Sequence, residues 1–430
     1  MSCDQDVLIA AAAFIVTANK KIKKKAKPRR FWVRPSLQSR EIYNTSHLLS
    51  DLISDDTDIL NLEYRCNGGF RNFFRMSPSQ FNELLNMVIP SITKNDTNFR
   101  KAIPAQDRLA ITLRFLATGD SYHSLSYLFK ISKQTISKIV PEVCKAIVDV
   151  LKEYVKMPKN ESEWRLVARE YEAKWNFPNC VGAMDGKHIA VQAPEWSGTD
   201  YYNYKQFFSI VLFAIVDANY NFIYADVGCQ GRISDGGVFN NTSFCKSIEL
   251  CTLNLPPDVS HPGRTVKSPY VFVGDDAFPL LRNILKPYPG IQEKGSANRI
   301  FNYRLSRERR TSENVFGILS SVFRVFRKPL LLDPEKATNV TLAAIYLHNY
   351  QRNSPSKKIY CPPGTLDSEC SDTRVTIPGA WRKDSLEQTS FNNFPRVARK
   401  SSLDATEVRN EFREYFLTNE GRVSWQYENS

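Results

Sequence analysis

The segment VGAMDGKHIAV, from Val181 to Val191, limits the possible folds more than any other part of the chain. It is apolar at both ends and reads as a buried strand, yet Asp185 stands in its middle. A lone buried carboxylate costs on the order of several kcal/mol unless it is paired, hydrogen-bonded or bound to a metal. For this segment alone, a strand end at which Asp-Gly opens a turn is the simpler explanation. The rest of the chain has to decide between a turn and a site.

A mixed α/β pattern extends from about residue 173 to residue 350. Apolar segments predict four strands, of which the second and third form a hairpin around a turn at Asp217: Cys180–Val191, Phe207–Val216, Phe222–Val227 and Tyr270–Val273. Apolar residues at helical spacing predict a long helix from Leu305 to about Phe326. Three antiparallel strands and a helical crossover to a fourth strand beside the first give the order of an RNase H-like sheet. We therefore expect an α/β domain with a mixed five-stranded sheet and flanking helices.

Four acids occupy notable positions in this predicted domain: Asp185, Asp235, Asp275 and Glu313. If the first and fourth strands are parallel neighbours, Asp185 and Asp275 face each other across the roughly 5 Å between strands. The long helix can supply Glu313 as a third acid. Converging carboxylates repel unless a cation joins them, so the pattern indicates Mg²⁺ or Mn²⁺ and phosphodiester cleavage by activated water. Taken singly, Asp235 can be a turn residue and Glu313 a solvated helix residue.

Basic residues surround Glu313 on the same predicted helix. Arg309 and Arg310 lie one turn earlier on the side of Glu313, and Arg304 and Arg307 extend the basic face. The arginines can form surface ion pairs, or they can form a phosphate-facing cluster next to the metals.

The N-terminal half is predicted to be helical over residues 31–160. Ser77 and Pro78 begin one helix, and residues 105–155 form several short ones. The last two, joined at Ile131–Ser132, have the pattern of a helix-turn-helix. The second of these helices begins with side chains able to contact bases or phosphates: Lys133, Gln134, Thr135, Ser137 and Lys138. An ordinary helical hairpin with a soluble face is the alternative.

The formal charge of the 430-residue chain is +13, which suggests a polyanionic partner, most often nucleic acid. Part of this charge lies in Asn19–Arg30, where eight of twelve residues are Lys or Arg. Residues 1–30 are expected to be disordered. The basic run Asn19–Arg30 can act as a nuclear-localisation signal or can contact the DNA backbone. Nine cysteines without CxxC spacing argue against disulfides and structural zinc, and the apolar run Val7–Ala18 is too short to span a bilayer.

A polar C-terminal tail is expected over residues 353–430. The stretch Asn353–Ser402 is rich in proline and serine and is expected to pack loosely. A last helix is predicted over Glu407–Leu417.

Several segments together resemble the PIF/Harbinger transposases and the nucleases derived from them: FWVRP, RLAITLRFLATGDSYHSLSYLFKIS, MDGKHI, SDGGVF, VGDDAFPLL, NYRLSRERRTSENVFGIL and LHNY. The resemblance implies a DDE-type, RNase H-like DNA endonuclease behind a helix-turn-helix region, working in the nucleus with Mg²⁺. Asp185, Asp235, Asp275 and Glu313 match the acids assigned to the family's metal site. Lys187 departs from the family, where a small residue is common.

The resemblance also implies a separate Myb-like (SANT) partner protein that supplies much of the DNA binding and nuclear import. It leaves open whether the chain is an active transposase or a domesticated host protein. It also leaves open whether the chain forms an oligomer. The alternative function is that of a retired transposase serving as a DNA-binding or chromatin-associated factor. A retired copy would be free to lose its acids, so their presence favours the endonuclease.

Overall fold

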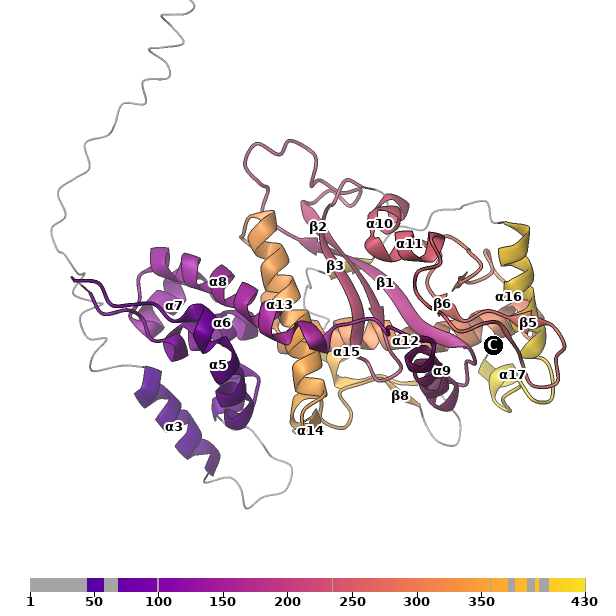
Figure 1. Cartoon of the computed structure of the whole chain (residues 1–430), viewed down its shortest axis with the longest axis horizontal. Coiled ribbons are helices and arrows are strands. Elements are labelled where there is room, and N and C mark those ends of the chain that lie inside the picture. Colours follow the sequence, from indigo (N-terminus) through magenta and orange to yellow (C-terminus); the bar gives the residue numbers. More distant parts are fainter. Residues whose placement is uncertain are drawn as a thin grey trace, which may run out of the picture.

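The computed structural model describes residues 45–57, 69–98, 100–233, 235–355, 357–369, 376–384, 391–393 and 402–429. The apolar run Val7–Ala18, the basic run Asn19–Arg30 and the FWVRP segment lie outside these residues. N-terminal helices gather at one end of an elongated molecule, the sheet lies in the middle, and the last long helix lies at the other end (Figure 1). No helix in the described part of the chain is both long and apolar enough to cross a membrane.

Five strands form the central sheet in the order β3-β2-β1-β6-β7: β1 Cys180–Ala190, β2 Ser209–Val216, β3 Phe222–Gln230, β6 Val271–Val273 and β7 Ile284–Leu285. β2 is antiparallel to β1 and to β3, whereas β6 is parallel to β1 and to β7. The mixed five-stranded sheet with flanking helices is therefore confirmed. The predicted neighbourhood of the first strand and the strand Tyr270–Val273 is also confirmed, because Ala183 pairs with Val273.

A sixth strand, β10 (Phe391–Asn393), comes from the C-terminal region and pairs antiparallel with β1. β2 occupies one edge of β1 from Ala183 to Ala190. The other edge is shared, since β6 pairs with its beginning at Cys180–Ala183 and β10 with its end at Lys187–Ile189. Asp185 lies between these two pairings.

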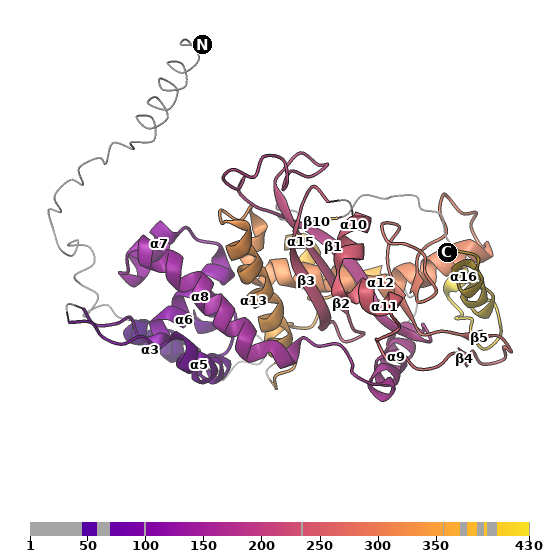
Figure 2. The same ribbon diagram turned by 45° about the horizontal axis from the view of Figure 1, so that its top comes forward.

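Helices cover both faces of the sheet. On one face, Ala183 and Ile189 of β1 share a hydrophobic cluster with Val315 and Leu319 of α12 (Ala297–Val322). On the other face, Met184 packs in a second cluster with the short helices α10 (Asp235–Asn241) and α11 (Ser243–Glu249). Strand side chains alternate between faces, so residues 183, 185, 187 and 189 of β1 point toward α12. Figure 2 shows α12 running along the sheet.

The long helix begins earlier than expected. α12 starts at Ala297 instead of Leu305 and ends at Val322, before the short 3-10 helix η3 (Arg324–Arg327). The Ser296 hydroxyl caps the start by accepting a hydrogen bond from the Arg299 amide. The first two turns are rich in polar residues and hide the apolar period, which explains the difference.

The N-terminal region is helical where it is described: α3 Thr45–Thr57, α4 Gly69–Phe74, α5 Pro78–Ile92, α6 Ala105–Thr118, α7 Tyr122–Phe129, α8 Lys133–Leu151 and η2 Lys152–Tyr154. Ser77 and Gln80 form the reciprocal capping pair at the start of α5. Lys130 adopts a left-handed conformation between α7 and α8, and Ser132 caps α8. The helices themselves are as expected, whereas a DNA-binding role for the α7–α8 pair stays a prediction.

Two helices connect the N-terminal region to the sheet. α8 lies beside α13 (Pro334–Arg352), which packs on β3, as Figure 1 shows. The Tyr350 hydroxyl donates to the Gln80 carbonyl at 3.0 Å, and the Asn349 side chain donates to the Tyr154 carbonyl at 2.7 Å. α9 (Glu161–Trp175) then leads into β1.

The remaining elements lie around the edges of the domain: β4 Val259–Ser260, β5 Lys267–Ser268, α14 Lys357–Tyr360, β8 Ser368–Glu369, β9 Thr376–Ile377, α15 Ala380–Asp384, α16 Leu403–Tyr415 and α17 Gln426–Asn429. The expected last helix, Glu407–Leu417, corresponds to α16. The expectation of loose packing over Asn353–Ser402 is wrong for the described parts of that stretch. Asp367 has a fully buried side chain, and Phe391 packs against the rings of Phe316 and Phe326.

Candidate active site

Asp185 lies in the middle of β1 on the face that α12 covers. Its side chain is only 3% exposed. Oδ1 accepts a hydrogen bond from the Gly186 amide at 2.8 Å. Oδ2 accepts no well-directed hydrogen bond within the described part of the chain, although the Lys187 ammonium lies 2.9 Å away. The buried acid is therefore neutralised by its strand neighbour and keeps an oxygen whose hydrogen-bonding capacity is unused.

Asp275 follows β6 directly, two residues beyond the last residue that pairs with β1. Burial raises the pKa of the Asp275 carboxyl, and the negative charge of Asp185 raises it further. The positive charges of Arg309 and Lys187 act in the opposite direction. The charge of Asp185 thus reaches Asp275, as expected for an acid at the end of the neighbouring parallel strand.

Asp276, the residue after Asp275, interacts with a different part of the molecule. Its charge acts on Arg409 of α16, whose pKa it raises against the larger effect of burial. Both residues lie beyond the end of β6 at Val273; the charge of Asp185 acts on Asp275, whereas the charge of Asp276 acts on Arg409 of α16.

Glu313 is connected to the two aspartates through Arg309. Its Oε1 lies 3.2 Å from Nη2 of Arg309, and its side chain is 38% exposed. Burial lowers the pKa of Arg309, but the negative charges of Asp185, Glu313 and Asp275 outweigh it and raise the pKa. One guanidinium therefore lies among three of the acids that the sequence singled out. Asp235 begins α10, and its side chain is outside the described residues.

Arg304, Arg307 and Arg310 do not form an exposed basic face on α12, so that expectation is wrong. Arg304 is buried and donates to the Gly421 carbonyl at 3.0 Å. Arg307 is buried and donates to the Trp175 carbonyl and to Glu369. Arg310 also pairs with Glu369, at 3.2 Å, and its side chain is 15% exposed. These residues attach α12 to α9 and to the C-terminal region.

The predicted DNA-contacting side chains of α8 lie at its N-terminal end. Lys133, Gln134 and Lys138 are exposed, whereas Thr135 is partly buried. The Thr135 hydroxyl lies 2.8 Å from the Ser132 hydroxyl and so contributes to the helix cap. Lys133 Nζ lies 3.0 Å from His123 Nε2 on α7. Three of the four side chains are thus directed toward solvent.

The donor atoms of this site suit a hard divalent cation, because Asp185, Asp275 and Glu313 offer only carboxylate oxygens. No group of three or more His, Cys, Asp or Glu within the described residues is arranged to hold a metal as it stands. Lys187 and Arg309 supply the positive charge instead. The acids fit a metal provided that these two cations withdraw from between them.

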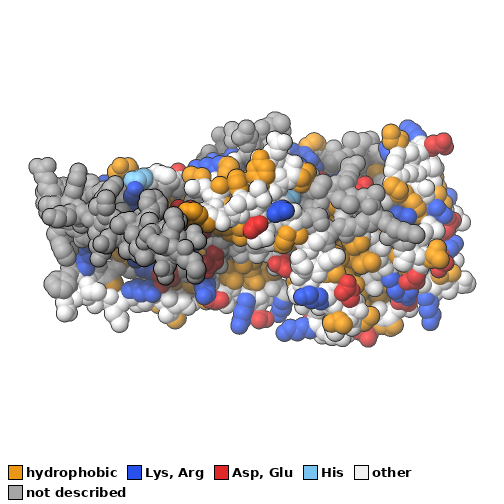
Figure 3. Space-filling model, turned by 90° about the horizontal axis from the view of Figure 1, so that it is seen from above, with side chains coloured by type: hydrophobic (Ala, Val, Ile, Leu, Met, Phe, Trp, Pro, Cys, Tyr) orange, Lys and Arg blue, Asp and Glu red, His pale blue; other side chains and the backbone are white. Residues whose placement is uncertain are grey.

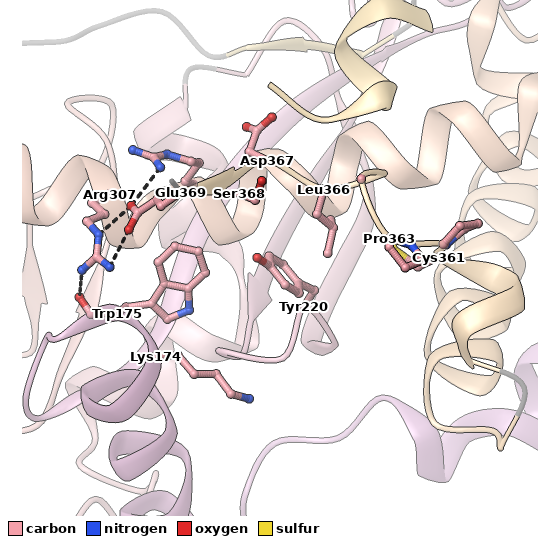
Figure 4. A pocket seen from close by; sticks show the side chains of 13 residues that line it. Lys174, Trp175, Tyr220, Arg307, Cys361, Pro363, Leu366, Asp367, Ser368 and Glu369 are labelled. Carbon is pink, nitrogen blue, oxygen red and sulfur yellow. Dashed lines mark hydrogen bonds and ion pairs between the residues drawn. The ribbon is translucent and has the colours of Figure 1, made fainter. Parts of the chain in front are cut away.

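A cavity lies elsewhere in the described part of the chain. It has a volume of about 480 Å³ and is lined by Trp175, Tyr220, Arg307 and Glu369, among others. Figure 4 shows that two of its walls are the Arg307–Glu369 pair and the aromatic rings. Its arginines are already neutralised by Glu369. A second cavity, of about 260 Å³, lies between Ser137 of α8, Glu195 and Asp333.

Sequence reasoning missed two cations next to the acids. Lys187 was noted only as a departure from the family, although its position two residues after Asp185 puts both on one strand face. Arg382 lies 3.6 Å from Oε2 of Glu313, and no local pattern singled it out.

Comparison with known proteins identifies the domain. Residues 184–349 match the sequence profile of the DDE superfamily endonucleases. Residues 184–349 are a DDE superfamily endonuclease domain. Residues 61–149, which cover most of the helical region, match a domain of unknown function. The endonuclease domain contains Asp185, Asp235, Asp275 and Glu313, and ends before the segment that carries Arg382 and β10.

Relatives that match about two thirds of the chain agree with this assignment, and the resemblance to Harbinger transposase-derived proteins is confirmed. Protein ALP1-like from Arabidopsis thaliana is 25% identical over 65% of this chain and 70% of its own length. The Arabidopsis protein Antagonist of Like Heterochromatin Protein 1 is 24% identical over 65% of this chain and 72% of its own. HARBI1 from Mus musculus, whose name assigns it to the nucleases, is 23% identical over 67% of this chain and 80% of its own. No solved structure matches.

Proposed function

We propose that the chain is a metal-dependent DNA endonuclease of the DDE transposase type, which cleaves phosphodiester bonds with activated water. The proposal rests mainly on the positions of Asp185 and Asp275. Each lies two residues beyond Ala183 and Val273, the last residues that pair in parallel between β1 and β6, and the charge of Asp185 acts on Asp275. Glu313 joins them through Arg309. DDE superfamily endonucleases use divalent metals, in agreement with the carboxylates found here.

Mg²⁺ or Mn²⁺ would be held by Asp185, Asp275 and Glu313, with Asp235 as a fourth acid. When bound, such ions lower the pKa of water and stabilise the leaving oxygen. The chain's own cations have a different task. Lys187 and Arg309 keep the acids together when no metal is bound, and the exposed side of Glu313 leaves the site open to solvent. Ca²⁺ should bind and support cleavage poorly, because its looser coordination misplaces the water.

DNA is the proposed substrate, and the nucleus the proposed compartment. The exposed Lys133, Gln134 and Lys138 of α8 support DNA contact by the helical region, with Thr135 at the helix start. On the described part of the face seen in Figure 3, basic and acidic side chains are interspersed. A Myb-like partner that adds DNA affinity and directs import would suit such a surface.

Nicking of a supercoiled plasmid that carries the terminal repeats of a related element tests the proposal. We expect cleavage with Mg²⁺ or Mn²⁺, loss of cleavage in excess EDTA, and loss of at least two orders of magnitude in rate for Asp185→Asn. The variant keeps the side-chain volume and should keep DNA binding. Robust cleavage in EDTA would refute a metal-dependent mechanism. Binding without any cleavage, with and without a partner protein, would support the retired DNA-binding factor instead.

A further inference from the structure

We infer that a C-terminal clamp, made of Asp367, Trp381, Arg382 and Phe391, completes the nuclease site, and that Arg382 binds a phosphate of the DNA. The clamp lies beyond the matched endonuclease domain, which ends at residue 349. The inference rests on the proposed function, because it assigns to the same site a residue that contacts the substrate.

Two members of the clamp attach it to α12 next to Glu313. The Trp381 indole donates a hydrogen bond to Oδ1 of Asn314 at 2.8 Å, and the Asp367 amide donates to the same oxygen at 3.1 Å. The Trp381 ring lies so close to Gly317 that a Cβ there would come within 2.3 Å of it. Only glycine at position 317 admits this ring, so the helix surface is shaped for the clamp.

Arg382 is held in a fixed position at the edge of the site. Its guanidinium forms hydrogen bonds of 2.6, 2.9 and 3.0 Å with the buried Asp367 carboxylate. The Trp381 ring centroid lies 4.4 Å from the guanidinium carbon. Nη2 also lies 3.6 Å from Oε2 of Glu313, and the side chain is 40% exposed. An arginine that Asp367 holds in this position, with its side chain partly exposed next to the third acid, is preorganised for an anion.

Phe391 brings the clamp to the other acids. It packs between the rings of Phe316 and Phe326, and pairs with Ile189 of β1. The strand β10 therefore resumes the edge of β1 only two residues after Asp185, where Lys187 pairs with Asn393. The clamp thus borders the site on the β1 side and on the α12 side.

The chemistry of the substrate explains why a cation is needed here. A phosphodiester that approaches Asp185, Asp275 and Glu313 is repelled by like charges unless cations offset them. Arginine presents a planar fork that matches two phosphate oxygens, and it stays charged at any physiological pH. Arg382 can accept a phosphate from solvent while Asp367 keeps it in place. The competing explanation is that Arg382 only supports Glu313.

DNA binding measured without metal separates the two explanations. In EDTA, Arg382→Gln should weaken binding and reduce the slope of log K against log salt by about 0.9, the value for one phosphate contact. Arg382→Lys keeps the charge and should keep most of the slope. The matched control is Arg165→Gln on α9, whose side chain is 42% exposed and paired with Glu161. This control should bind as the wild type does.

A double variant guards against a folding artefact. Arg382→Gln alone leaves the Asp367 carboxylate buried without its partner, whereas Asp367→Asn with Arg382→Gln removes both charges. If the double variant melts like the wild type and still loses the slope, the phosphate contact is supported. A folded double variant with the wild-type slope would overturn it. Because this readout needs no cleavage, a wild type that binds but does not cut contradicts the proposed function without touching this inference.

Discussion

At the scale of single residues, the acids of this site are held together by the chain's own cations. Asp185 pairs with Lys187, and Arg309 responds to the charges of Asp185, Asp275 and Glu313. A cluster of carboxylates without any cation would be destabilised by mutual repulsion. Lys187 and Arg309 therefore stabilise the cluster of acids when no metal is bound, and a metal has to compete with these two side chains for the carboxylates.

The register at the end of β6 can be tested with two neighbouring substitutions. Asp275→Asn should lower the cleavage rate by several orders of magnitude, because this carboxyl faces Asp185. Asp276→Asn should cut at a rate near that of the wild type, since Asp276 acts on Arg409. Plasmid nicking measures both, and DNA binding serves as the control for folding. The opposite ranking would mean that the wrong aspartate was assigned to the site.

Glu308, one position before Arg309, makes the stability of the fold depend on pH. It is completely buried, and burial raises the pKa of its carboxyl to about 8. An unfolded glutamate loses its proton near pH 4.5, whereas the folded one keeps it to about pH 8. The free energy of unfolding should therefore fall as the pH rises from 4.5 to about 8, by at most about 1.4 kcal/mol per pH unit.

Glu308→Gln tests this by removing the titrating proton. Relative to the wild type, the variant should gain stability steadily between pH 5 and pH 8 in urea unfolding experiments. Equal pH dependence of the two proteins across that range would show that Glu308 is ionised in the folded state.

Local pattern singled out Asp185 within a predicted strand, Asp275 after another strand and Glu313 on a predicted helix, and their assignment to a metal site stays a prediction. Local pattern was not enough for Arg382. This residue follows a proline- and serine-rich stretch with no apolar period, and its place next to Glu313 depends on contacts with Asp367 and α12 that are distant in the chain. The misplaced basic face of α12 has a similar cause. The spacing of Arg304 and Arg307 is helical, but α9 and the C-terminal region bury both.

At the scale of secondary structure, the same distinction between local and distant information holds. The hairpin β2–β3 and the parallel pair β1–β6 followed from apolar segments and their order. The three residues of β10 carry no recognisable strand pattern, and only their pairing with Lys187–Ile189 makes them a strand. The cap at Ser77 could be predicted because Pro78 and an apolar stripe follow it. The cap at Ser296 could not, because polar residues follow it and hide the start of the helix.

The role of α8 in DNA binding can be tested at its first turns. Lys133→Ala combined with Lys138→Ala removes two exposed charges and should lower DNA affinity and flatten its salt dependence. Lys152→Ala combined with Lys156→Ala, beyond the C-terminal end of α8, removes two exposed charges and serves as the control. Fluorescence anisotropy on duplex DNA over a salt series measures both. Identical salt slopes for the two pairs would exclude a special role for the start of α8.

At the scale of the whole molecule, the net charge of +13 is unevenly distributed along the chain. Asn19–Arg30 alone holds eight basic residues. In the endonuclease domain, by contrast, arginines such as Arg307 form ion pairs with acidic residues of the same chain, here with Glu369. Long-range attraction to nucleic acid should therefore depend strongly on the N-terminal run.

Deletion of Lys20–Arg30 tests the cellular role of this charge. A fluorescently tagged chain without this run should accumulate less in the nucleus, because a dense Lys/Arg run can act as an import signal. Replacement of the run by a neutral linker of equal length controls for chain length. Undiminished nuclear accumulation of the deletion would place the signal elsewhere or on a partner.

The shared edge of β1 also determines when the central sheet becomes complete. β6 reaches this edge from the middle of the chain, but β10 comes from residues 391–393 and is made long after the acids. Until residues 391–393 have been synthesised, the edge of β1 at Lys187–Ile189 has no β10 to pair with. An unpaired strand edge invites other chains to pair with it. Chains that end before residue 391 should therefore leave this part of the β1 edge unpaired and be prone to aggregate.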